Sequence, residues 1–271
     1  MNPIHVRAPA TTANLGSAFD CAGVALDLWN ELRVVEDDSA PVADTHHIGI
    51  SAFARVAAAD GLRFDFTYGI PRASGLGSSA SLIALGLVAG SLATGADLDP
   101  ERLLAAGLPL EGHPDNLAPA LVGGACVTWD GRIERLAENV PADPVVVRSD
   151  EPPTHTAEAR AALPISVPHE DAAYSAGRAT LLGAALASGS EMLFAAALDD
   201  RLHEPYRSAF LADLRRDLPD AALGATLSGS GPTVIVWARR GHAEECATAL
   251  RERWPDLQAA PLDVSSRGAI P

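Results

Sequence analysis

A run of glycines and serines between residues 72 and 81 has the composition of a phosphate-binding loop. Gly75 and Gly77 allow backbone angles that other residues avoid, and they let a ligand approach the main chain closely. A helix that begins at about Ser78 would direct free backbone N–H groups and the positive end of its dipole at the loop, which suits an anion such as phosphate. The serines add hydroxyl groups that could bind phosphate oxygens or a metal ion. The same pattern also fits an ordinary Gly/Ser turn before a buried helix.

The segments on either side predict how this loop is held. Apolar residues alternate with other residues over 62–68, which indicates a strand. Residues 82–94 are apolar, rich in Ala and Leu and free of proline, which indicates a buried helix. The chain contains no lysine. This excludes both the Lys-bearing Walker P-loop and a catalytic lysine.

Two other stretches are dense in polar residues that could face a substrate. Asn14 and Asp20 lie among small, turn-forming residues near the N-terminus. His113, Asp115 and Asn116 lie at an expected helix start. Local turn chemistry explains the first pair equally well, and helix capping explains Asp115. Capping explains His113 and Asn116 less readily.

Composition narrows the classes of partner and compartment. The chain has 271 residues, 48% of them hydrophobic and 20% charged, which is typical of a globular protein with one large domain or two ordinary ones. A net charge of −15 argues against nucleic acid and an acidic membrane surface as the main partners. The cysteines (Cys21, Cys126 and Cys246) are widely spaced, and the sequence shows neither a signal-peptide core nor a membrane-spanning run. We therefore expect a reduced, cytoplasmic setting.

The first half of the chain has a mixed pattern of helices and strands. We expect a strand over 4–8 that Pro9 halts, a strand over 24–36, a helix over 48–59, a helix that begins after Asp99 and ends near Gly107, and a strand over 125–129. A shift of composition around 130–145 predicts a domain boundary there.

The second half begins with a strand at 145–147, continues with helices, and ends in the order strand, turn, strand, helix, strand. The turn, residues 228–232, is a second Gly/Ser loop that also fits a plain hairpin. This order favours a split βαβ sandwich with helices on one face of an antiparallel sheet.

Several stretches resemble a known family. Residues 9–20, 74–81, 113–124 and 227–233 resemble, in order and spacing, the motifs of the GHMP small-molecule kinases. The residues around Asn14 and around His113, together with 156–164 and 204–207, resemble the branch of that family that phosphorylates L-homoserine in threonine biosynthesis. Any single motif is weak evidence, but the six together cover nearly the whole chain.

The resemblance implies an α+β fold of two domains. Residues 1–140 would form an N-terminal domain like the second domain of ribosomal protein S5, and residues 141–271 a C-terminal ferredoxin-like α/β sandwich. The active site would lie between them. The implied reaction transfers a phosphoryl group directly from ATP to L-homoserine, with Mg²⁺ as the metal. Homodimers are common in the family, and the sequence leaves the oligomeric state open.

The resemblance also assigns roles to individual residues. It places substrate contacts at Asn14, Asp20, His113, Asn116, Arg160 and Arg207, with Asn116 and Arg160 as the catalytic residues. It places ATP contacts at Arg72, Ala73, Ser74, Gly75, Leu76, Gly77, Ser78, Ser79 and Ala80, and metal contacts at Ser79 and Glu111. Asp20 would hold the α-ammonium group, and the two arginines would pair with the α-carboxylate. An exposed salt bridge is the alternative for each arginine.

One departure from the family pattern concerns the metal. The family has a Glu four residues before the motif His, where this chain has Pro109. Glu111 is the nearest carboxylate, and Mg²⁺ commonly takes only one or two protein ligands. Two alternatives stay open: a GHMP kinase for another alcohol or for a phosphorylated substrate, and a catalytically weakened nucleotide-binding member, which Pro109 alone favours.

Overall fold

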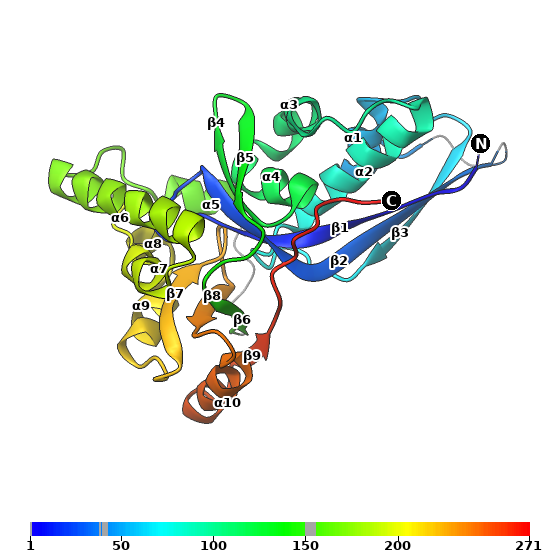
Figure 1. The fold of residues 1–271 in the computed structure, drawn as a ribbon. Coiled ribbons are helices and arrows are strands. Elements are labelled where there is room, and N and C mark those ends of the chain that lie inside the picture. Colours follow the sequence, from blue (N-terminus) through cyan, green and yellow to red (C-terminus); the bar gives the residue numbers. More distant parts are fainter. Residues whose placement is uncertain (1, 38, 40–42, 150–155) are drawn as a thin grey trace.

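The computed structural model describes residues 2–37, 39, 43–149 and 156–271, and these form two antiparallel sheets with packed helices (Figure 1). The elements in chain order are β1 (Ile4–Ala13), β2 (Ala22–Glu36), α1 (Ile48–Ala54), β3 (Leu62–Tyr68), α2 (Ser78–Thr94), α3 (Pro100–Glu111), α4 (Pro114–Val122), β4 (Ala125–Trp129), β5 (Arg132–Ala137), β6 (Asp143–Arg148), α5 (Thr156–Ala161), α6 (His169–Ser188), α7 (Glu191–Ala197), α8 (Glu204–Arg207), α9 (Ala209–Arg216), β7 (Ala222–Leu227), β8 (Val234–Ala238), α10 (Ala243–Arg253) and β9 (Gln258–Pro261).

The first sheet has the strand order β1-β2-β4-β5, with β3 paired to β2. Helix α2 packs against β1 and β2, and α1, α3 and α4 surround it. Residues 80–91 of α2 are all buried, so this helix is apolar around its whole circumference, as expected of a helix enclosed on every side. The predicted order of strand, Gly/Ser loop and buried helix is confirmed. The N-terminus of α2 is thereby fixed at one end of the sheet.

Two prolines behave differently from the sequence prediction. The first strand does not halt at Pro9 but runs to Ala13, because the pairing with β2 shifts register between Pro9 and Ala10. Such an irregularity accommodates a residue that has no N–H to donate. Helix α3 likewise continues past Pro109 to Glu111, and the N–H of Gly112 still bonds to the carbonyl of Leu108 at 2.8 Å. Strand β5 was not predicted at all.

The second sheet has the order β7-β8-β6-β9, and its strand β8 is buried along its whole length. Val234 and Val236 of β8 pack with α9 and α10, whereas Ile235 and Trp237 face the opposite side. There Trp237 meets Phe194 of α7 edge-to-face, with ring centroids 5.3 Å apart. Helices thus contact both faces of this sheet rather than one.

The two sheets share one apolar core. Val24 of the first sheet, Leu182 of α6 and Trp237 of the second sheet belong to the same buried cluster. After β9 the chain returns to the first sheet, where Ile270 forms a β-bridge with Arg7 (Figure 1). The division at residues 140 and 141 stays a prediction, and this return crosses it.

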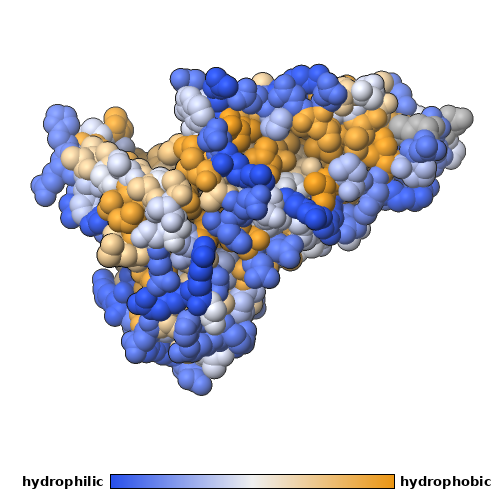
Figure 2. Space-filling model, in the orientation of Figure 1, coloured by the Kyte–Doolittle hydropathy of each residue, from blue (hydrophilic) through white to orange (hydrophobic). Residues whose placement is uncertain are grey.

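The outer surface is polar at its ends. Figure 2 shows hydrophilic side chains over the far ends of both halves, with apolar residues gathered where helices cover the first sheet. No helix in the described ranges combines the length and apolar character needed to span a bilayer.

The contact between α1 and α2 generates a stability prediction. A Cβ added at Gly86 would lie 2.0 Å from the carbonyl oxygen of Gly49, so Gly86→Ala must push the two helices apart. We expect a loss of about 1–3 kcal/mol in the free energy of unfolding. Gly183→Ala in α6 is the control, because nothing lies within 4 Å of its added Cβ. It should stabilise the protein by about 0.5–1 kcal/mol. Urea unfolding of both variants measures this, and equal effects would contradict the packing argument.

Candidate active site

The Gly/Ser loop bends sharply before α2. Gly77 is the N-cap of the helix, with φ of 63°, and a Cβ there would lie 1.8 Å from the Thr11 hydroxyl. Glycine is therefore required for both its conformation and its size. The Ser74 hydroxyl donates to the carbonyl of Pro71 at 2.8 Å and accepts from the N–H of Leu76 at 3.3 Å. Ser74 thus shapes the loop from within.

The structure brings most of the predicted ATP residues to one pocket and leaves three outside its lining. Leu76 and Ala80 are buried beneath the loop, and Arg72 is exposed. The pocket-lining members are Ala73, Ser74, Gly75, Gly77, Ser78 and Ser79. The pocket therefore lies at the free N–H groups of the first turn of α2, where an anion is stabilised.

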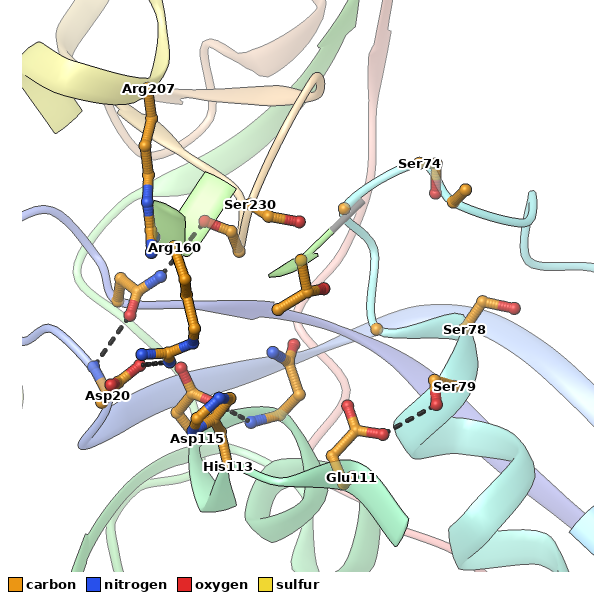
Figure 3. Close-up of a pocket in the computed structure, with 17 residues that line it drawn as sticks. Asp20, Ser74, Ser78, Ser79, Glu111, His113, Asp115, Arg160, Arg207 and Ser230 are labelled. Carbon is orange, nitrogen blue, oxygen red and sulfur yellow. Dashed lines mark hydrogen bonds and ion pairs between the residues drawn. The ribbon is translucent and has the colours of Figure 1, made fainter. Parts of the chain in front are cut away.

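Glu111 faces this loop across the pocket (Figure 3). The Ser79 hydroxyl donates to its carboxylate at 2.8 Å. Burial raises the pKa of Glu111, and the Ser79 hydrogen bond opposes that shift only in part. Pro109 is exposed on α3 and does not line the pocket. The carboxylate that this chain presents to Ser79 is therefore Glu111, two residues later than the family position.

A charged cluster forms the opposite side of the pocket (Figure 3). Arg160 of α5 donates to the Asp20 carboxylate at 2.5 Å. Arg207 of α8 also points into the pocket, and its Nε donates to the carbonyl of Ala159 at 3.3 Å. Both guanidinium groups lie over the ring of Phe19, at 5.4 Å for Arg160 and 5.0 Å for Arg207. Burial lowers the pKa of Arg207, and neighbouring Arg160 lowers it further.

Asn14 joins the chain segments that surround this cluster. Its amide nitrogen donates to the carbonyl of Gly229 at 3.2 Å, and its amide oxygen accepts from the N–H of Asp20 at 2.9 Å. Asn14 and Asp20 both have positive φ, of 75° and 58°. Backbone of this kind is uncommon outside glycine and persists where the surroundings over-determine it. The loop is thus held in one shape that presents the Asp20 carboxylate.

The three polar residues at the start of α4 face the same pocket. The Asn116 amide oxygen accepts from the Thr11 hydroxyl at 2.7 Å. Burial lowers the pKa of His113, and Arg160 lowers it further. Asp115 is only 4% exposed, and burial followed by the charge of Asp20 raises its pKa to about 7. The capping explanation for Asp115 is wrong, because His113 is the N-cap of α4 and Asp115 lies inside its first turn, where its Oδ1 accepts from the N–H of Asn116 at 3.0 Å.

The six predicted substrate residues all line this pocket, together with residues that the sequence did not assign to it. Gly229 and Ser230 come from the second Gly/Ser loop, whose composition was the available signal. Thr156 also lines the pocket; it begins the stretch 156–164 that carries the family resemblance, but the resemblance assigned a role only to Arg160 there. No cluster of three or more His, Cys, Asp or Glu side chains that could hold a metal occurs among the described residues.

Family models match both halves of the chain. The GHMP kinases N terminal domain matches residues 46–124, and the GHMP kinases C terminal domain matches residues 172–256. The chain therefore belongs to the GHMP kinases.

Individual relatives narrow the assignment. A homoserine kinase of Clavibacter michiganensis is 38% identical over 306 aligned residues, which cover 99% of this chain and 96% of the relative. Another, from Streptomyces avermitilis, is 37% identical and covers 98% and 94%. Within the GHMP kinases, the chain belongs to the homoserine kinase family. A crystal structure of homoserine kinase from Cytophaga hutchinsonii shares its fold, with a TM-score of 0.87 at 24% identity over 100% of this chain and 97% of that one.

The raised pKa of Asp115 predicts a pH-dependent effect on stability. An unfolded Asp titrates near 3.9, whereas folded Asp115 titrates at about 7. Between these two pH values the unfolded chain has released the Asp115 proton and the folded chain retains it. The raised pKa therefore lowers the free energy of unfolding by an amount that is absent at low pH and greatest above pH 7. Asp115→Asn keeps the Oδ1 acceptor and removes the penalty. We expect it to stabilise the protein more at pH 8 than at pH 5.

Urea unfolding of Asp115→Asn at both pH values makes this measurement. Asp213→Asn is the control, because Asp213 is exposed on α9 and pairs with Arg216 at the surface. Its effect should be small at both pH values. A stability difference for Asp115→Asn that does not grow with pH would show that Asp115 is ionised in the fold.

Proposed function

We propose that this chain transfers the γ-phosphoryl group of ATP to the side-chain hydroxyl of L-homoserine. One observation carries the proposal: the Asp20–Arg160 ion pair and Arg207 share a pocket with the N-terminus of α2. An amino acid supplies one ammonium and one carboxylate group. Asp20 would take the ammonium group, and Arg160 and Arg207 would take the carboxylate, so that the ligand replaces the internal ion pair without leaving a buried charge unpaired.

The ATP phosphates would lie at the first turn of α2. The N–H groups at that turn have no partner within the helix and carry the positive end of its dipole. Ser78 and Ser79 line the pocket and bring hydroxyl groups to the same place. This arrangement explains how a chain without lysine, and with a net charge of −15, could bind a polyanion.

Ser79 and Glu111 have the donor atoms that Mg²⁺ requires. A hydroxyl and a carboxylate oxygen only 2.8 Å apart are hard oxygen ligands that could share one small cation. The partly buried position of Glu111 raises its pKa, and a cation bound beside it would compensate the charge of the carboxylate. Bound there, Mg²⁺ would neutralise charge on the transferred phosphoryl group.

For the transfer itself, the pocket must align the substrate hydroxyl with the γ-phosphorus of ATP. Thr11 fixes the amide oxygen of Asn116, and this leaves the amide nitrogen to donate to the substrate hydroxyl. The hydroxyl oxygen attacks the γ-phosphorus, the bond between that phosphorus and the bridging oxygen of ADP breaks, and the hydroxyl proton passes to a phosphoryl oxygen and then to solvent. Such a transfer needs alignment and charge stabilisation more than a strong base. Arg160 would hold the substrate carboxylate while the hydroxyl is aligned.

The alternative of a catalytically weakened protein loses its support. That reading rested on Pro109, which is exposed on α3, whereas Glu111 faces Ser79. A kinase for an alcohol without a carboxylate is not favoured either, because such a ligand would offer no anionic partner to the Arg207 guanidinium that points into the pocket.

ADP release by the purified protein tests the function. Mg·ATP is supplied with L-homoserine and, separately, with L-serine, L-threonine, mevalonate and shikimate. Selective turnover of L-homoserine is the expected result. Turnover of another alcohol in preference to L-homoserine, or ATP binding without turnover of any, would overturn the proposal.

The proposed metal role predicts the behaviour of Glu111→Gln. The amide removes the negative charge and keeps the shape, so we expect the Mg²⁺ concentration for half-maximal activity to rise by about tenfold or more. The KM for L-homoserine should change little, because the charged cluster stands on the other side of the pocket. Glu101→Gln on the same helix is the control, since Glu101 pairs with Arg132 outside the pocket. An unchanged Mg²⁺ requirement in Glu111→Gln would remove Glu111 from the metal site.

A further inference from the structure

A completely buried histidine lies directly behind the charged cluster. His203 is 0% exposed, precedes α8, and does not belong to the pocket lining. Asp200 fixes its main chain, because the Asp200 carboxylate accepts the backbone N–H groups of His203 at 2.7 Å and Glu204 at 3.1 Å. The ring is therefore held between α8 and the loop that carries Asp20.

The partners of the His203 ring define its tautomer. Nε2 lies 2.8 Å from the carbonyl oxygen of Gly16. A carbonyl can only accept, so Nε2 carries a proton. In the neutral ring Nδ1 is then an acceptor, and it lies 3.5 Å from Nη1 of Arg207, which donates to it. His203 thus links the Gly16 loop to the guanidinium group that points into the pocket.

The surroundings of the ring favour its neutral form. Burial lowers the pKa of His203, and Arg207 acts in the same direction. Asp200, whose carboxylate lies 3.6 Å from Nε2, and Asp20 oppose this shift. A second proton would be placed on Nδ1, directly against the Arg207 guanidinium.

Stacking fixes the plane of the same ring. His203 stacks on Phe19 with ring centroids 4.9 Å apart and an interplanar angle of 23°. Arg207 also lies over the Phe19 ring. The guanidinium is therefore oriented by the Phe19 face, by the carbonyl of Ala159 and by His203 Nδ1. The Nε–H and Nη1–H groups thus bond to two different acceptors, and His203 Nδ1 is the one that lies on a side chain.

We propose that His203 is a positioning residue that aims Arg207 at the substrate's carboxylate and so sets the preference for amino-acid alcohols. The inference rests on the proposed function. His203 itself touches no substrate and acts only through Arg207. Its contribution should therefore appear with substrates that have the carboxylate and disappear with those that lack it.

Two substitutions at His203 separate its two hydrogen bonds. His203→Gln can place an N–H near Nε2 and keep the bond to Gly16, but it offers no acceptor at Nδ1. His203→Asn can place its oxygen near Nδ1 and keep the acceptor for Arg207. Each variant is assayed with L-homoserine and with 3-aminopropan-1-ol, which is homoserine without its carboxylate. His169→Gln is the control, because His169 is exposed and does not line the pocket.

The expected result for His203→Gln is a KM for L-homoserine raised about tenfold, as for loss of one hydrogen bond to a charged group, with the KM for ATP unchanged. The kcat/KM for 3-aminopropan-1-ol should not change. His203→Asn should recover most of the L-homoserine affinity, and His169→Gln should match wild type. In an Arg207→Ala background, His203→Gln should have no further effect on binding of L-homoserine measured by calorimetry.

Other outcomes overturn the inference. Equal losses with both alcohols, or a full His203→Gln effect that persists without Arg207, would show that the histidine only maintains the fold. If thermal unfolding shows that His203→Gln does not fold, the test passes to His203→Asn, which keeps an acceptor for Arg207. Loss of the preference for L-homoserine over 3-aminopropan-1-ol in that variant would contradict the proposal. Wild-type protein that neither binds nor phosphorylates L-homoserine would overturn the proposed function as well. If the wild-type protein selects L-homoserine and His203→Gln behaves like it, the inference about His203 is overturned but the proposed function is not.

Discussion

The buried hydroxyl of Ser228 joins three segments on which the site depends. It donates to the carbonyl of Gly75 at 2.7 Å and lies 2.9 Å from the hydroxyl of Thr12. These contacts tie the β7–β8 turn to the phosphate loop and to β1, and Asn14 adds a bond to Gly229 of the same turn. The two sheets therefore cannot separate without breaking bonds between buried polar groups, which is costly. This connection holds the anion site and the charged cluster at a fixed separation, as a positioning mechanism requires.

Electrostatics in the pocket follow from burial more than from net charge. The chain carries −15, yet the two cations of the cluster are arginines, which stay charged when partly buried. Around them the buried carboxyl group of Asp115 titrates at about 7, and burial raises the pKa of Glu111. Low local dielectric strengthens each of these interactions. A zwitterion and a metal-bound phosphate would therefore meet complementary charges in a partly buried pocket, where solvent screens them less than at the open surface.

Local signals in the sequence predicted the elements that carry the site, but not their contacts. Alternation and apolar runs located β3 and α2, and glycines marked the loop between them. The extension of β1 through Pro9 depends on its register with β2, which only the folded sheet defines. Leu76 lies within the loop motif but faces the core, because packing decides which loop residues point outward. The burial of Asp115 and the contacts of Ser228 and His203 depend on segments about 90 to 215 residues away, which no local pattern contains.

The central claim is that this pocket recognises a zwitterionic alcohol beside a phosphate-binding helix terminus. The most direct measurement is kcat/KM for phosphorylation of L-homoserine, of 4-hydroxybutanoate, which lacks the ammonium group, and of 3-aminopropan-1-ol, which lacks the carboxylate. Phosphate-ester formation can be followed by phosphorus NMR at fixed Mg·ATP. The account predicts a preference for L-homoserine of at least about a hundredfold over either analogue. A comparable kcat/KM for either analogue would contradict it.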